Sequence, residues 1–141
     1  MALPVPVPGL VIRYSYLWRS DHDAGHEQSP KARPAVIVLA VTKKQGEPTR
    51  VLVSPITHTD PGFERGLEIP PKLKSALGLD EGRSWIVTDD INAFEWPGYD
   101  LEQIPGMLGK FAYGYLPRKF FYRLRDAILA HKPPVQMTRR N

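Results

Sequence analysis

Two polar residues stand at the ends of neighbouring apolar segments. Arg33 opens the run RPAVIVLAV (33–41), and Thr57 closes the run VLVSPIT (51–57). Both runs are rich in β-branched residues and are bounded by turn residues, which predicts two buried strands. A guanidinium and a hydroxyl at neighbouring strand ends make a small oxyanion-binding pair, because the guanidinium fork matches two oxygens and the hydroxyl donates to a third.

His58 follows Thr57 directly and is a candidate acid or base, because imidazole titrates near neutral pH. Side chains alternate between the two faces of a strand, so His58 points away from Thr57 if Thr57 ends the strand. Each residue also has an ordinary structural interpretation. An arginine before a buried strand is often a surface charge, and a threonine after one often caps a turn.

The rest of the chain predicts short strands and a late helix. We expect strands at 9–18, 34–42, 50–56, 67–69 and 84–91, with 92–96 continuing the last one past a bend. A short helix is expected from Lys72 to Leu77, ended by Gly78, and a longer one from Pro117 to His131. Polar loops occupy 19–32 and 57–62, a turn falls at 96–98, and 100–116 is predicted to be irregular.

Size and composition favour one small folded domain. The chain has 141 residues, and we assign residues 1–132 to the domain, with a proline-rich arm at 1–8 and a disordered tail at 133–141. Fifteen prolines argue against a long helical bundle. The lack of cysteine excludes disulfides and thiolate zinc sites. With neither a secretion signal nor an apolar stretch that could span a membrane, we expect a cytoplasmic protein with no membrane partner.

The net charge of +4 is unevenly distributed. Residues 101–141 hold eight Lys and Arg against two acidic residues, a net +6, so residues 1–100 carry −2. Such a basic segment can attract a polyanion, and it is equally typical of an ordinary solvated helix face.

One combination of motifs resembles a known family. Glu27-Gln28, followed by Arg33-Pro34-Ala35-Val36-Ile37-Val38 and then by Ser54-Pro55-Ile56-Thr57, is similar to the MazF/PemK family of toxin–antitoxin endoribonucleases. Residues 9–18 resemble that family's opening strand, and residues 85–91 its late strand with an acidic residue. The resemblance covers about residues 9 to 95 and a closing helix.

The resemblance implies both a fold and an activity. The fold would be a mainly β (α+β), SH3-like small barrel of about five to seven strands, with short helices and a C-terminal helix packed on it. The activity would be that of a growth-inhibiting toxin: metal-independent cleavage of single-stranded RNA by a homodimer that a cognate antitoxin inhibits. The catalytic arginine and threonine of the family fall on Arg33 and Thr57, and its RNA-contacting loop pair on Glu27 and Gln28.

Departures from the family pattern support an alternative. Leu10 replaces the usual acidic residue after Gly9, Pro30 lies in a lengthened stretch before Arg33, and the segment after Trp96 is larger and more aromatic. The alternative is a non-catalytic SH3-like module that binds nucleic acid or protein and has lost the chemistry.

Further residues are candidates for contact with RNA. Trp18 and Trp96 offer rings on which unpaired bases could stack, and Lys31 and Thr59 flank the catalytic pair in sequence. His22, Asp23, His26 and Glu27 suggest a metal site, but the glycine and polar residues among them argue against the helix that would align them. We expect no metal and no other cofactor.

Overall fold

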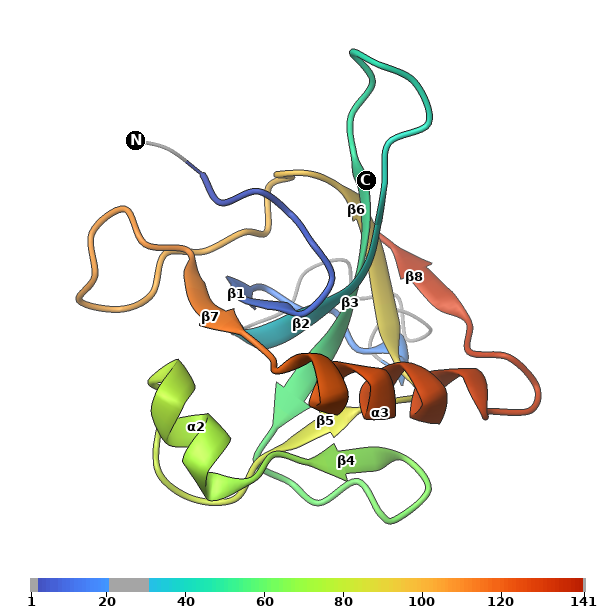
Figure 1. Cartoon of the computed structure of the whole chain (residues 1–141). Helices are drawn as coiled ribbons and strands as arrows, with labels where there is room; N and C mark the ends of the chain where they lie inside the picture. The colour runs from blue at the N-terminus through green and yellow to red at the C-terminus, as the bar shows by residue number, and fades with distance from the viewer. Residues whose placement is uncertain (1–2, 21–30, 141) are drawn as a thin grey trace.

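Most of the chain lies in a strongly twisted sheet with two helices packed on it (Figure 1). The structure is a computed structural model that describes residues 3–20 and 31–140. In these residues the elements are β1 (Leu10–Tyr14), β2 (Arg33–Val41), β3 (Arg50–Thr57), β4 (Gly66–Glu68), α2 (Pro71–Leu77), β5 (Trp85–Val87), β6 (Ile91–Glu95), β7 (Ala112–Tyr115), α3 (Arg118–Leu129) and β8 (Met137–Arg139). The prediction of a mainly β domain is confirmed.

β3 is the strand around which the others are arranged. One of its edges pairs with β2, and the other pairs first with β6 and then, past Ser54-Pro55, with β5. β1 and β7 extend the sheet beyond β2, β4 extends it beyond β5, and β8 joins the outer edge of β6. All pairs are antiparallel except β6 with β8. Among the described strands β4 and β7 do not pair, so the sheet is not closed into a barrel.

Strand alternation divides the buried side chains into two cores on opposite faces of the sheet. The first core comprises Leu10, Ile12, Tyr14, Tyr16, Ala35, Ile37, Val51, Val53 and Phe94. The second core comprises Val11, Val36, Ile56, Ile69, Leu77, Ile86, Leu116, Phe120 and Leu124. Because successive side chains in β1, β2 and β3 alternate between the two cores, the face on which a residue at a strand end lies follows from the buried residues that precede or follow it in the same strand.

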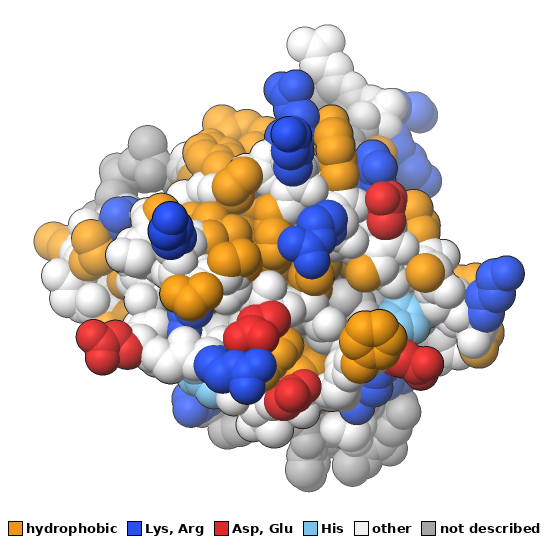
Figure 2. Space-filling view, turned by 60° about the horizontal axis from the view of Figure 1, so that its bottom comes forward, with side chains coloured by type: hydrophobic (Ala, Val, Ile, Leu, Met, Phe, Trp, Pro, Cys, Tyr) orange, Lys and Arg blue, Asp and Glu red, His pale blue; other side chains and the backbone are white. Residues whose placement is uncertain are grey.

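The two helices cover the second core, and both follow the sequence prediction closely. α2 begins at Pro71, where a missing N–H costs nothing, and ends at Gly78, whose φ of 68° is the left-handed conformation of a helix C-cap. α3 buries Phe120 and Leu124, one turn apart. On the face in Figure 2, Lys and Arg side chains are scattered between apolar ones and form no continuous strip.

Three predictions about the strands are wrong in detail. The expected strand over 84–91 is two strands, β5 and β6, because each pairs with a different half of β3. The segment 100–116, predicted to be irregular, contains β7, which pairs with β1. The described residues hold eight strands, where five to seven were expected.

Part of the segment predicted as a disordered tail (133–141) forms a strand, β8 (Met137–Arg139). β8 pairs in parallel with β6, and Thr138 is buried. Arg140 extends this contact: its Nη1 donates to the Ser15 carbonyl oxygen at 2.9 Å, and its Nη2 lies 3.0 Å from Asp100 Oδ1. With only 4% of its side chain exposed, Arg140 joins the C-terminal segment to β1 through buried polar contacts.

We expect Arg140→Ala to destabilise the protein by about 3 kcal/mol, since it leaves a mostly buried carboxylate and a carbonyl without their charged partner. Arg139→Ala removes an exposed side chain from the same strand and should change stability by less than about 0.5 kcal/mol. Urea unfolding of both variants measures the difference. Equal losses would show that the Arg140 contacts add no stability.

A second buried polar contact joins the segment that follows β1 to Asp90, which lies between β5 and β6. The Tyr16 hydroxyl donates to Asp90 Oδ1 at 2.6 Å, and the Arg19 N–H donates to Oδ2 at 3.2 Å. Burial raises the pKa of Asp90 above the ordinary carboxyl value of 3.8, although these hydrogen bonds act in the opposite direction. The native state therefore holds the Asp90 proton more tightly than the unfolded chain does.

This shift predicts how stability depends on pH. The stabilisation from protonated Asp90 is fully present below 3.8 and is lost as pH rises through the raised pKa. Asp90→Asn keeps an acceptor for Tyr16 and cannot ionise, so the wild type should lose stability relative to this variant as pH rises from 3.8 through the raised pKa of Asp90. Urea unfolding at a series of pH values tests this, and a constant difference would contradict it.

Candidate functional site

Arg33 and Thr57 lie opposite each other at the ends of β2 and β3. The last residue pair in this part of the ladder is Ala35 with Pro55, and two further residues along each strand give Arg33 and Thr57. Opposite residues of an antiparallel pair point to the same face. Both residues accordingly line one hollow of about 470 Å³, on the face of the first core.

The hollow combines cations, hydroxyls and one carboxylate. Its lining consists of Trp18, Arg33, Thr57, Thr59, Asp60, Pro61, Arg65 and Val87. Arg65 is held by Asp89, whose carboxylate lies 2.6 Å from its Nε and raises the pKa of the guanidinium. The structure therefore brings together four residues that the sequence analysis named as site candidates: Trp18, Arg33, Thr57 and Thr59. It adds Asp60 and Arg65 to them.

Trp18 orients Arg33. The Arg33 guanidinium carbon lies 5.1 Å from the centre of the Trp18 ring, a cation–π distance. The Trp18 ring in turn packs edge-on against Tyr16 at 5.3 Å, and Tyr16 belongs to the first core. The indole is thus partly occupied by contacts within the protein, so positioning Arg33 is its role in the structure and base stacking stays a prediction.

Thr57 is positioned by its own loop. Its Oγ1 accepts the Thr59 N–H at 3.1 Å, so the residue does make the turn contact that its type favours. In the described part of the chain nothing accepts its hydroxyl proton, which leaves that proton for an oxygen in the hollow. Asp60 fixes the next turn, because its Oδ1 accepts the Gly62 N–H at 2.8 Å.

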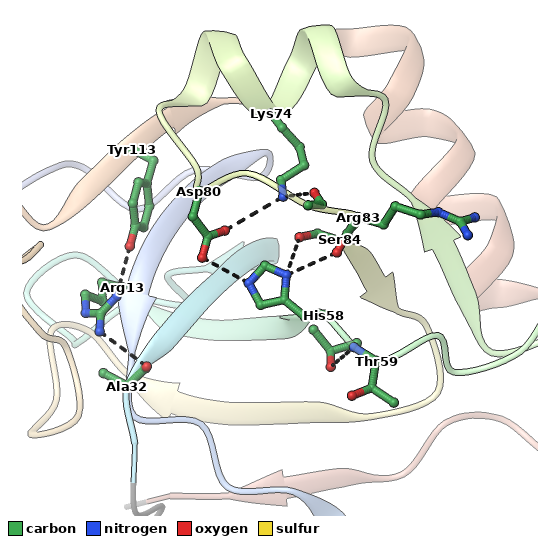
Figure 3. Close-up of polar contacts among 11 residues, drawn as sticks. Arg13, Ala32, His58, Thr59, Lys74, Asp80, Arg83, Ser84 and Tyr113 are labelled. Carbon is green, nitrogen blue, oxygen red and sulfur yellow. Dashed lines mark hydrogen bonds and ion pairs between the residues drawn. The ribbon is translucent and has the colours of Figure 1, made fainter.

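His58 points to the opposite face and is held on both sides of its ring (Figure 3). Nδ1 lies 3.1 Å from the Arg83 carbonyl oxygen and 3.2 Å from Ser84 Oγ, and Nε2 lies 3.1 Å from Asp80 Oδ2. The carbonyl and the carboxylate can only accept, so each takes a hydrogen bond from the ring nitrogen that faces it when that nitrogen carries the proton. The structure does not bring His58 to the hollow that contains Thr57.

Ser84, His58 and Asp80 form a hydrogen-bonded series that is similar to a hydrolase triad. Ser84 is only 1% exposed, so its hydroxyl is almost closed to solvent although the residue borders a pocket. Nδ1 also faces the Arg83 carbonyl, and a ring N–H donated there cannot take a proton from Ser84. We conclude that this cluster supports the protein structure and supplies no nucleophile.

A second pocket, of about 360 Å³, lies on this opposite face. Its lining includes Arg13, Lys31, Arg33, His58, Asp80 and Tyr113. Lys31, predicted to contact RNA, belongs to this pocket rather than to the hollow beside Thr57. Arg33 borders both cavities, since it stands at the strand end between the two faces.

Trp96 lies away from both cavities. Its backbone N–H donates to the carbonyl oxygen of Thr49, just before β3, and the centre of its ring lies 6.2 Å from that of the Phe94 ring. A strand rises about 3.3 Å per residue, so eight residues of β3 separate Trp96 from Thr57 by about 25 Å. Trp96 therefore lines neither cavity and its ring packs against the first core, while its contact with RNA stays a prediction.

The remaining predicted site residues cannot be placed. Glu27 and Gln28 lie outside the described residues, as do His22, Asp23 and His26 of the metal alternative. Among residues 3–20 and 31–140, no three His, Asp or Glu side chains come close enough to hold a metal ion. In the same residues, no helix is both long and apolar enough to cross a membrane.

Sequence reasoning missed Arg13, Asp60, Arg65 and Tyr113. Arg13 was visible as the polar residue that interrupts the apolar β1, where alternation places it on the face away from Tyr14. Tyr113 had no such signal, because its place depends on β7 pairing with β1.

The chain matches no family model, no curated protein and no solved structure. The function of this site must therefore be argued from its own chemistry.

Proposed function

We propose that this protein is a MazF/PemK-like endoribonuclease that cleaves single-stranded RNA without a metal ion, with Arg33 and Thr57 acting at the scissile phosphodiester. One observation carries the proposal: both residues line the same open hollow from adjacent strand ends. A guanidinium held by a tryptophan and a hydroxyl with an available proton are the donors that a phosphoryl group needs.

The reaction uses the RNA's own nucleophile. The 2′-hydroxyl attacks the adjacent phosphorus, the bond from phosphorus to the 5′-oxygen breaks, and the products are a 2′,3′-cyclic phosphate and a free 5′-hydroxyl. Arg33 neutralises two phosphoryl oxygens and Thr57 donates to one of them, which stabilises the charge that builds up on the phosphorane.

Two protons must also move, one from the 2′-hydroxyl and one to the departing 5′-oxygen. His58 was the first candidate for this work, but it faces the other pocket. Asp60 lines the hollow, with one carboxylate oxygen held by Gly62, so we assign it the removal of the 2′-hydroxyl proton. Water supplies the proton to the 5′-oxygen.

Several broader features belong to the same proposal. They are an SH3-like barrel architecture, a homodimer, a cytoplasmic location and a cognate antitoxin that blocks the hollow. The strand order β5-β3-β2-β1 with helices over one face is compatible with a small curled β domain of that kind. An acidic or apolar antitoxin segment would compete with RNA for Arg33.

The first test removes the charge that the proposal requires. We expect the wild type to cleave long single-stranded RNA in the presence of EDTA, and Arg33→Ala to be slower by at least about a hundredfold, the usual cost of losing one strong donor to the transition state. Mapping of the RNA 5′ ends measures cleavage, and thermal unfolding shows whether the variant folds.

Arg50→Ala is the matched control, because it removes a charge at the far end of β3, where Arg50 pairs with Glu95. Its cleavage rate should stay within about twofold of the wild type. Intact RNA with the wild-type protein, together with measurable binding, would instead favour the non-catalytic module.

The second test separates the Thr57 hydroxyl from its methyl group. Thr57→Ser keeps the hydroxyl and the bond from Thr59, so we expect cleavage within about tenfold of the wild type. Thr57→Val keeps the shape and removes the donor, so cleavage should fall by about a hundredfold. A valine variant as active as the serine variant would exclude Thr57 from the reaction.

A further inference from the structure

The pocket on the second-core face contains a guanidinium that lacks an acidic partner. Arg13 Nη1 donates to the Tyr113 hydroxyl at 3.2 Å, and Nη2 donates to the Ala32 carbonyl oxygen at 3.4 Å. Both acceptors are neutral and both bonds are long. In the described part of the chain no carboxylate forms an ion pair with Arg13, although the side chain is partly buried. A half-buried cation in this state is well placed to bind an anion.

Among the described residues that line the pocket, Asp80 is the only carboxylate, and two neighbouring side chains hold it. Asp80 Oδ2 lies 3.1 Å from His58 Nε2, and Asp80 Oδ1 lies 3.7 Å from the buried Lys74 Nζ. Asp80 therefore pairs with His58 and Lys74 and not with Arg13. Figure 3 shows the Arg13 guanidinium beside the Tyr113 hydroxyl, and Asp80 beside His58.

The position of the pocket relates it to the hollow beside Thr57. Arg13 and Tyr14 are consecutive in β1 and face opposite sides, and they pair across to Pro34 and Arg33 respectively. Arg33 borders both cavities, so the two anion sites are separated by a single strand end. A flexible polyanion that follows this edge of the sheet can occupy both.

We propose that the Arg13 pocket is a second phosphate subsite, which holds the phosphate adjacent to the scissile one. This inference rests on the proposed function, because it takes the substrate to be an oligonucleotide. Arg13 binds the phosphate oxygens through its two Nη groups, and the Tyr113 hydroxyl donates to a further oxygen. The protein accordingly prefers substrates that carry at least two successive phosphates.

The test measures binding rather than cleavage. The probes are a 2′-O-methyl trinucleotide with two phosphates and two matched trinucleotides in which one phosphate or the other is replaced by a neutral methylphosphonate. The 2′-O-methyl groups prevent attack on the phosphorus. For the wild type, replacing either phosphate should weaken binding by about tenfold, as loss of a charge-assisted contact does.

Arg13→Gln should weaken binding of the fully charged probe by about tenfold and reduce the slope of log affinity against log salt by about 1. The affinity of this variant should not change when the phosphate that Arg13 binds is replaced by a methylphosphonate, and it should still fall when the other phosphate is replaced. Tyr113→Phe should show a smaller loss at that same phosphate, and it provides the same test if Arg13→Gln does not fold. Arg50→Gln, at the far end of β3, is the control and should bind every probe as the wild type does.

The outcomes separate this inference from the proposed function. The subsite is overturned if Arg13→Gln and Tyr113→Phe bind the probes as tightly as the wild type does. It is also overturned if their affinity falls by the same factor for all three probes. Neither result affects the proposed nuclease activity. RNA left intact by the wild type, with binding that depends on Arg13 at one phosphate, overturns the nuclease and leaves the pocket as an anion site.

Discussion

The structure depends on the way β3 shares its two edges. β2 occupies one edge, while β6 and β5 divide the other at Ser54-Pro55. Because β2 and β3 are antiparallel, the start of β2 at Arg33 lies beside the end of β3 at Thr57, and the register from Ile37↔Val53 to Ala35↔Pro55 places both side chains on one face. The placement of Arg33 beside Thr57 is therefore a consequence of strand register and requires no special loop conformation.

The period of two in a β-strand then decides which polar groups can work together. Thr57 and His58 are neighbours in sequence, but they belong to different cavities on opposite faces of the sheet. Arg13 and Tyr14 are divided in the same way. Arg33 is the exception, because its long side chain stands at a strand end and borders both cavities. An edge with cationic groups on both sides suits an extended, flexible polyanion better than a small compact one.

Buried polar contacts join the segment that follows β1 to β8 and to the residue that precedes β6. Arg140 and Asp100 join β8 to the first strand region, and Tyr16 and Asp90 join that region to the start of β6. Burial raises the pKa of both carboxyls, so each ionised group is stabilised less well than it would be in water. These contacts specify which segments meet, while the two apolar cores supply most of the favourable burial.

The sequence alone determined the elements whose signal is local: the strands around Arg33 and Thr57, the helix that ends at Gly78, and the long α3. It also indicated that Arg33 and Thr57 would converge, since adjacent apolar runs commonly form one hairpin. Only the tertiary structure decided the positions of β7, β8 and Trp96, and the division of residues 84–95 between two strands. Those features depend on pairing between segments far apart in the chain, where a short polar or glycine-containing run forms a strand because a partner edge is available.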